Sequence, residues 1–151
     1  MAREIALTLL LTVLPISELR GGIPLGIALG LPPLLTFSIA VLANALMFFP
    51  IFLALDLFYD RLLYRIPLLD RYLARVRERG KPKVDRYGFW GLAFIVALPL
   101  PITGVYTGTA LAWLLGIDRR KAFPAIALGA IIAGAIVLLI VLGLVALPGV
   151  V

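Results

Sequence analysis

The sequence predicts an all-α integral membrane protein of two inverted repeats, each a re-entrant helical hairpin followed by a transmembrane helix, with an interfacial amphipathic helix between them. Three observations predict this fold class. Of the 151 residues, 63% are hydrophobic, well above the roughly 45–50% of ordinary soluble domains. Nine of the 14 Lys and Arg residues lie between positions 61 and 86, so two apolar blocks flank one basic segment. Both blocks contain the same motif, and we treat residues 1–151 as one membrane domain.

The first expected element is a re-entrant hairpin over residues 5–30. Its two limbs, 5–14 and 17–30, are apolar but would form helices of only about 15–20 Å, whereas a bilayer core is about 30 Å thick. Pro15 and Pro24 interrupt them. A broken backbone at membrane depth must be packed in protein or line a polar cavity, so the break indicates an interior. Two full crossings in place of each hairpin are the alternative, and limb length argues against them.

Two stretches, 35–56 and 122–147, are long and apolar enough to be transmembrane helices. Asn44 is the strongly polar residue within positions 36–55 of the first, and we expect it to pack across the interface with the hairpin. Together the stretches predict a multi-pass protein of the cell (plasma) membrane.

The segment between the repeats, 57–87, is a basic amphipathic cytoplasmic linker by its pattern. Apolar residues recur at helical spacing beside arginines four residues apart, which is typical of an interfacial helix. We expect the helix to break before Pro67 and to end at Gly80-Lys81-Pro82. The linker and the basic residues 119–121 then lie on one side, as the positive-inside rule requires. Such a segment is attracted to anionic headgroups, or it gathers substrate or contacts a partner.

The second hairpin, residues 88–116, repeats the first. LPISELRGGIPLGIALG (14–30) aligns without a gap with LPITGVYTGTALAWLLG (100–116), and Pro99 and Pro101 break the second copy. One crossing per copy would place the two hairpins on opposite faces. Small residues recur every four positions in both copies and predict close helix packing between the hairpins. The packing glycines are Gly22, Gly26, Gly30, Gly108 and Gly116.

Glu18 heads this stripe and should point at the partner hairpin. A carboxylate there costs several kcal/mol unless it is paired, protonated or hydrated, which favours a proton carrier; the alternative is a contact with Arg20 or backbone that only fastens the loop. Arg20 offers a planar fork for phosphate or carboxylate, unless it extends to the headgroup layer. In the second copy Tyr106 takes its place.

Ser17 and Thr103 stand where they could cap the helices that follow, and Gly104 comes next. Two capped helix ends meeting in the membrane would bind anionic groups, as in broken-helix transporters; simple capping is the alternative. The candidate substrate- and proton-binding residues are Ser17, Glu18, Arg20, Thr103, Gly104 and Tyr106.

The chain has no Cys and no His, so we expect no metal site and no cofactor. One buried carboxylate without His, Cys or a second acid gives no general acid–base pair, so we do not expect an enzyme. The basic segment has no interleaved exposed aromatic residues outside a membrane setting, so we expect no nucleic-acid partner.

The motifs Pro15-x-Ser17-Glu18-x-Arg20-Gly21-Gly22-Ile23-Pro24 and Pro99-x-Pro101-x-Thr103-Gly104 resemble the small multidrug-export protein family, which is similar to the wider DedA (VTT-domain) superfamily. The resemblance covers nearly the whole chain. It implies two re-entrant hairpins and lipid transport, including polyprenyl-phosphate carriers, with proton coupling. By position, Glu18 matches the acidic residue of the first DedA hairpin. The arginines that DedA proteins carry in the second hairpin are missing here.

Residues and resemblance together predict a transporter or scramblase for an anionic lipid headgroup, proton-coupled through Glu18. One alternative is a small-molecule or multidrug proton antiporter, with Tyr106 and Trp113 lining its path. Another is a membrane scaffold that transports nothing. The expected partners are membrane lipids and a proton or other coupling ion, and so thin a core is compatible with a homo-oligomer.

Overall fold

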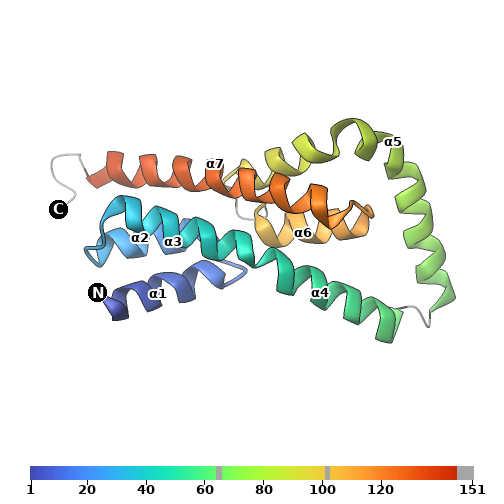
Figure 1. Ribbon diagram of the computed structural model, residues 1–151, viewed down its shortest axis with the longest axis horizontal. Coiled ribbons are helices and arrows are strands. Elements are labelled where there is room, and N and C mark those ends of the chain that lie inside the picture. Colours follow the sequence, from blue (N-terminus) through green and yellow to red (C-terminus); the bar gives the residue numbers. More distant parts are fainter. Residues whose placement is uncertain (64–65, 101–102, 146–151) are drawn as a thin grey trace.

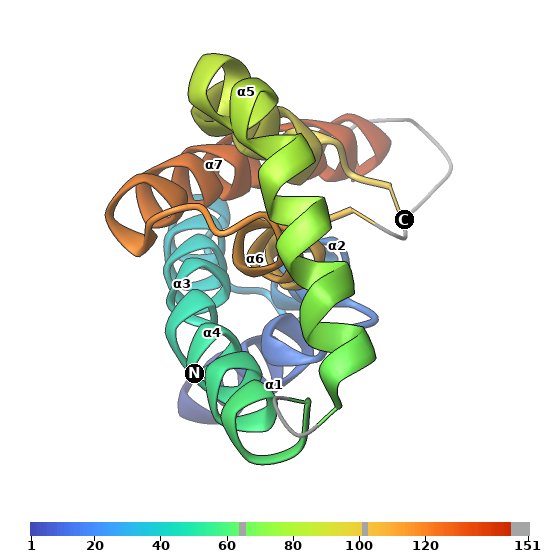
Figure 2. The same ribbon diagram turned by 90° about the vertical axis from the view of Figure 1, so that its right-hand side faces the viewer.

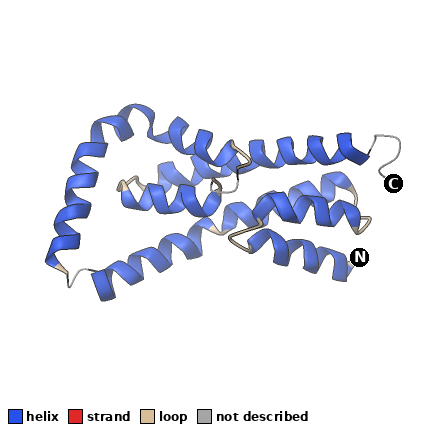
Figure 3. Ribbon diagram, turned by 180° about the vertical axis from the view of Figure 1, so that it is seen from behind, coloured by secondary structure: helices blue, strands red, loops and turns tan. Residues whose placement is uncertain are grey.

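The computed structural model describes residues 1–63, 66–100 and 103–145. Within these ranges the chain is helical apart from short connections and contains no strand (Figure 3), which confirms the all-α expectation. The helices are α1 (Ala2–Val13), α2 (Glu18–Ala28), α3 (Pro33–Leu46), α4 (Phe48–Phe58), the π-helical turn Tyr59–Leu63, α5 (Pro67–Ala97), α6 (Val105–Leu114) and α7 (Arg119–Val145).

Helices α1 and α2 form a helical hairpin whose closed end lies at residues 14–17 (Figure 1). They pack closely because α2 carries glycines at the contacts. A Cβ atom on Gly22 would lie 1.8 Å from Oγ1 of Thr12, and one on Gly26 would lie 2.5 Å from Cγ2 of Thr36. The expectation that these glycines face the other hairpin is therefore wrong: they face α1 and α3, because the hairpin's own limbs need the close approach.

Pro24 does not break the first hairpin, contrary to expectation. It lies inside α2, which begins six residues earlier at Glu18. The proline removes only the hydrogen bond that its N–H would have donated to the carbonyl of Arg20. The rest of α2 is held by tertiary packing, with Leu19 and Ile23 buried in the core, so the helix continues through the proline.

The first span consists of two helices, α3 and α4, that continue in nearly the same direction (Figure 1). The break at Met47 has a local cause, since Pro50 has no N–H to donate to the carbonyl of Leu46. The stretch Pro33–Arg61 is long and apolar enough to cross a membrane, and so is α7. The prediction of two spanning helices is therefore confirmed at the level of length and composition. Helix α7 begins three residues before the predicted span, and residues 146–147 lie outside the described ones.

Helix α5 corrects the prediction for the linker. It begins at Pro67, as expected, but runs through Pro82 to Ala97, so Gly80-Lys81-Pro82 does not end it. A proline inside a long helix often bends it rather than stopping it, and Figure 1 shows α5 bent between its green first half and its yellow-green second half. One helix thus joins the linker to the first limb of the second hairpin.

Helices α2 and α6 end in the same way. Gly30 and Gly116 have positive φ values of 83° and 69°. The next residues, Leu31 and Ile117, donate their N–H groups five residues back, at 3.0 and 2.9 Å, and both side chains are buried. This is the Schellman ending, which favours glycine. Gly30 and Gly116 thus set helix ends and are not the packing residues that the sequence predicted.

The closed ends of the two hairpins face each other near the middle of the molecule. The turn between α1 and α2 approaches the start of α6, while the N-terminus and the α6–α7 loop lie at opposite ends (Figure 1). Figure 2 shows α6 between α7 and α4. Helix α7 runs alongside the α5–α6 pair and α3, and its buried Ala125, Ile126 and Ala130 lie in the core. This arrangement brings position 18 to the start of α6.

Candidate functional site

Glu18 lies at the N-terminus of α6, although it belongs to the other hairpin. Its Oε1 atom accepts the N–H of Tyr106 at 3.4 Å, and the backbone of Val105 and the side chain of Asn44 lie beside the carboxylate. Glu18 is only 6% exposed. The free N–H groups of a helix N-terminus attract negative charge, so Glu18 occupies the anion-binding end of α6.

Gly104 leaves the space for this carboxylate. A Cβ atom there would lie 2.0 Å from Oε2 of Glu18. The backbone of Gly104 is extended, with φ 161°, so any residue could adopt its conformation. Glycine is therefore required here by the approach of Glu18 and not by the chain path.

Arg20 is the second charged contact between the hairpins. Its Nη2 atom donates to the backbone carbonyl of Thr103, and among the described residues it forms no salt bridge. In the other direction, the Tyr106 hydroxyl donates to the carbonyl of Val13. Glu18, Arg20 and Tyr106, all predicted site residues, thus meet at the two hairpin tips.

The backbone of Glu18 is unusual. Its φ of 47° makes it the one non-glycine residue with positive φ in the described chain, a conformation that costs of order 1–3 kcal/mol and is common at functional sites. Its N–H donates to the carbonyl of Leu14 at 3.0 Å, which closes the turn. The turn holds Glu18 at the first position of α2, from which its side chain reaches α6.

Ser17 and Thr103 do not cap the helices that follow them, which corrects the prediction. The Ser17 hydroxyl donates to the carbonyl of Leu11. The Thr103 hydroxyl donates to the carbonyl of Leu98 at 2.5 Å and accepts the N–H of Leu100 at 3.3 Å. Both hydroxyls satisfy the ends of the preceding helical limbs, and Glu18 caps α6 from the other hairpin. The residue pattern alone did not indicate that a residue of the first hairpin caps α6.

Asn44 of α3 was predicted as a packing residue, and the structure places it beside Glu18. Its side chain is 1% exposed, and in the described part of the chain its Oδ1 atom has no hydrogen-bond partner. A buried polar atom without a partner costs about 1–3 kcal/mol. Such an atom in a native protein calls for an explanation, and we assign Asn44 to the candidate site.

Two of the remaining predicted break residues, Pro15 and Pro99, lie beside the hairpin tips. Pro15 is in the turn between α1 and α2, and Pro99 follows the end of α5. Pro101 lies outside the described residues. Gly108 faces α5, because a Cβ atom there would lie 2.5 Å from Val96 of that helix.

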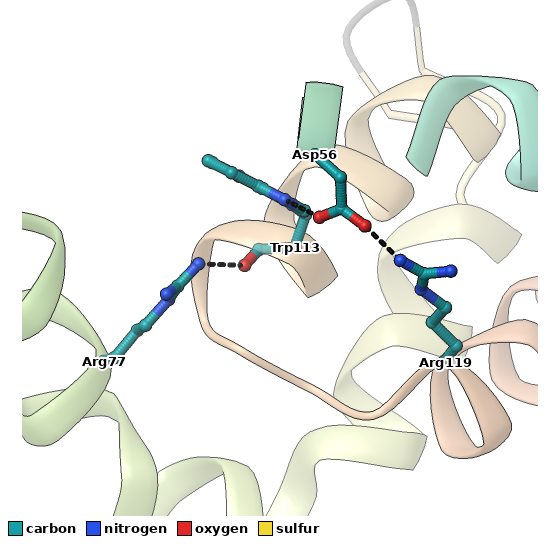
Figure 4. Close-up of polar contacts among 4 residues, drawn as sticks. All are labelled: Asp56, Arg77, Trp113 and Arg119. Carbon is teal, nitrogen blue, oxygen red and sulfur yellow. Dashed lines mark hydrogen bonds and ion pairs between the residues drawn. The ribbon is translucent and has the colours of Figure 1, made fainter. Parts of the chain in front are cut away.

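A second polar network, which sequence reasoning did not find, lies at the other end of α6 (Figure 4). Asp56 of α4 accepts the indole N–H of Trp113 at 2.7 Å and pairs with Arg119 of α7. Arg77 of α5 donates to the carbonyls of Trp113 and Leu114, both at 3.3 Å. Trp113, which the antiporter alternative places along a drug path, links α6 to α4 here. Partners so far apart in sequence give no local signal.

In chemical terms, the centre is a carboxylate held by helix N-terminal N–H groups, with a guanidinium close by. Among the described residues, no three acidic, His or Cys side chains are grouped so that they could hold a metal ion. The fold and this centre define a helical membrane protein with two apolar segments long enough to cross a membrane. Between its two helical hairpins lie a buried carboxylate and a partly buried guanidinium.

Comparison with known families identifies the group more closely. Residues 18–136, which are 119 of the 151, match the family model described as "Putative small multi-drug export protein", and the chain belongs to this family. The family name indicates a small multidrug-export or transport-type membrane protein. No curated protein and no solved structure matches the chain. The resemblance to the DedA superfamily stays a prediction.

Proposed function

We propose that this protein is a transporter or scramblase that moves an anionic lipid headgroup, of polyprenyl-phosphate or phospholipid type, across the plasma membrane with proton coupling through Glu18. The observation that carries the proposal is the position of Glu18 at the N-terminus of α6, beside Arg20. The N-terminus of α6 and the guanidinium of Arg20 form an anion site, and the carboxylate of Glu18 occupies it.

The proposal includes a membrane topology in which the two hairpins are re-entrant and belong to inverted repeats. Helices α1, α2 and α6 have 12, 11 and 10 residues, so each is about 15–18 Å long, roughly half of a 30 Å bilayer core. The matching ends of α2 and α6 at Gly30 and Gly116 support the repeat. The contacts between the tips support entry from opposite faces.

Exchange at the N-terminus of α6 provides the mechanism. While Glu18 is ionised, its carboxylate accepts the N–H of Tyr106 and occupies the N-terminus of α6. Protonation removes its negative charge and so weakens its attraction to the helix N-terminus. A phosphate then takes these donors, and Arg20 turns from the carbonyl of Thr103 to pair with it. Because the carboxylate gives up these donors to phosphate only when it takes up a proton, binding of the headgroup is coupled to uptake of a proton.

Liposomes containing the purified protein test this proposal. We expect Glu18→Gln and Arg20→Ala each to slow the movement of fluorescent lipid phosphates by about tenfold or more, since a charge-assisted hydrogen bond is worth about 1.5–3 kcal/mol. Arg120→Gln is the matched control, because Arg120 is exposed and far from the tips. Charge variants that move lipid phosphates as fast as the parent would refute the proposal.

A small-molecule or multidrug proton antiporter is the second candidate, and the family description favours it. In that case Glu18 would exchange a cationic compound for protons. Drug-dependent proton flux through the parent protein, absent when only phospholipid is offered, would select this function. If the parent moves neither kind of substrate and the charge variants lose heat stability, the protein is a scaffold in which Glu18 and Arg20 lock the hairpins.

A further inference from the structure

A separate polar cavity lies at the basic end of the molecule, where α5 meets the α6–α7 loop and the start of α7. Its volume is about 480 Å³. Four charged side chains line it, Asp85 and Arg86 from α5 with Asp118 and Lys121 from the other wall, and Trp90 stands at its edge. None of the hairpin-tip residues takes part.

The four charges are of both signs and are not paired with one another. Among the described residues, the salt bridges are Met1–Glu4 and Asp56–Arg119 alone. Asp118 uses Oδ1 to accept the N–H of Arg120 at 3.2 Å, and its second oxygen stays available. Two cations and two carboxylates around one cavity suit a ligand that carries an anion and a cation, because a strongly anionic ligand would meet both carboxylates.

An apolar groove of about 510 Å³ lies along the seam between α5 and α7 and shares one lining residue, Trp90, with this cavity. The residues that line it are Trp90, Ala93, Phe94, Ala97, Leu98, Leu128, Ile132 and Ile136. From Leu128 to Ile136 the helix rises about 12 Å, close to the roughly 15 Å of hydrocarbon in one leaflet. The groove thus has the length and the apolar lining of an acyl-chain site.

Trp90 joins the two spaces, since it lines both the polar cavity and the groove. Its side chain is 68% exposed, and tryptophan is typical of the membrane–water interface. A ligand that fills both spaces must have a compact charged head on one side of Trp90 and an apolar chain on the other.

We infer that this seam binds a phospholipid whose headgroup carries a phosphate and a primary ammonium, as in phosphatidylethanolamine. Arg86 and Lys121 bind the phosphate, Asp85 and Asp118 accept hydrogen bonds from the ammonium, and one acyl chain lies in the groove. A quaternary ammonium has no N–H to donate, so a choline headgroup binds less well. This inference is independent of the proposed function, because it requires no transport and uses none of the tip residues.

Tryptophan quenching by brominated lipids tests the site. The chain has two tryptophans, and Trp113 is only 9% exposed, so Trp90 reports contact with lipid chains. In nanodiscs of unlabelled phosphatidylcholine, we expect chain-brominated phosphatidylethanolamine to quench at a roughly tenfold lower mole fraction than brominated phosphatidylcholine or phosphatidylglycerol, since charge-assisted hydrogen bonds can supply such a ratio. The Trp90→Phe variant gives the background from Trp113 and should show no preference.

Variants separate headgroup binding from chain binding. The double variant Arg86→Gln with Lys121→Gln should lose the preference, whereas Arg120→Gln, beside Lys121 on the same exposed turn, should keep it. Ala97→Phe fills the groove and should reduce quenching by the ethanolamine lipid to the level of the choline lipid. Equal quenching by all three lipids in the parent protein, or a preference that survives the double variant, would overturn the inference.

Discussion

At the scale of single residues, the contact between the hairpin tips centres on Glu18. The second hairpin supplies the N-terminus of α6, and the first hairpin supplies the carboxylate that binds there. Glu18 takes a conformation with positive φ to do so, and Gly104 gives it room. Burial of a carboxylate at this place is tolerable because the helix N-terminus and Asn44 replace water. The same donors could hold a substrate anion.

Gly104→Ala tests how closely the tips fit. Its methyl group would lie 2.0 Å from Oε2 of Glu18, so the carboxylate must leave α6 or the tips must separate. We expect a loss of about 1–3 kcal/mol in the free energy of unfolding, as for other overpacked sites, together with slower transport. Thermal unfolding in detergent and liposome flux measure the two effects.

Gly91→Ala is the control for this substitution, because a Cβ atom there meets nothing within 4 Å. It lies inside α5, where alanine is favoured over glycine by up to about 1 kcal/mol, so stability should hold or rise. Equal behaviour of the Gly104 and Gly91 variants would contradict the close contact between Glu18 and Gly104.

At the scale of elements, the short helices owe their lengths to defined stops. Proline breaks stand before α5 and within the first span, where Pro50 separates α3 from α4. Helices α2 and α6 each end at a glycine. In both, the N–H of the glycine and the N–H of the residue after it donate to carbonyls of the last helical turns. Pro24 and Pro82 show that a proline alone does not decide the matter, because α2 and α5 continue through them. A stop requires local geometry and packing to agree.

Gly30→Ala and Gly116→Ala test the glycine stops. A residue with a Cβ atom pays about 1–2 kcal/mol in the left-handed region, so each variant should lower the free energy of unfolding by that amount. At Gly30 no atom lies within 4 Å of the added Cβ, so the loss there is purely conformational. Asparagine tolerates positive φ better than alanine, and Gly30→Asn should therefore lose less. A larger loss with asparagine than with alanine would argue against this account.

At the scale of the whole molecule, the two hairpins meet tip to tip, and long apolar helices run beside them (Figure 1). The N-terminus of α1 and the C-terminus of α2 lie at one end of the molecule, and the start of α7, with the basic residues 119–121, lies toward the other (Figure 1). The ion pair between Asp56 and Arg119 links α4 to α7 at that basic end. Because both partners are partly exposed, this pair adds only about 0.2–1 kcal/mol, and apolar packing holds the two halves together.

Cysteine labelling tests the re-entrant topology directly, since the described chain has no cysteine of its own. Arg3→Cys and Arg120→Cys mark the two ends, and an impermeant maleimide should reach them from opposite sides of the membrane. Ile16→Cys lies in the first hairpin tip. If the hairpin is re-entrant, this position stays near mid-membrane and should react much more slowly than Arg120→Cys from the basic side. Equally fast labelling there would mean that α1 crosses fully.

Hydrophobic content, apolar run length and charge clustering were sufficient to predict the helical class and the two spanning helices, because these properties depend on transfer of local segments from water to lipid. They were also sufficient to select Glu18 and Arg20, since charges in such runs are costly. The positions of the helix ends were harder to predict. Pro82 was expected to end a helix but lies inside α5, because a proline often bends a long helix without ending it.

The sequence by itself determined that the protein is a helical membrane protein and that a carboxylate and a guanidinium interrupt its first apolar block. Only the tertiary structure decided what those charges touch. It placed Glu18 on the N-terminus of α6, where the sequence had suggested a Thr103 cap. It also placed Asn44 beside Glu18 and joined Asp56 to Trp113 and Arg119. The physical reason is that these contacts join residues 26 to 88 positions apart, whose meeting depends on how whole helices pack and not on any local pattern.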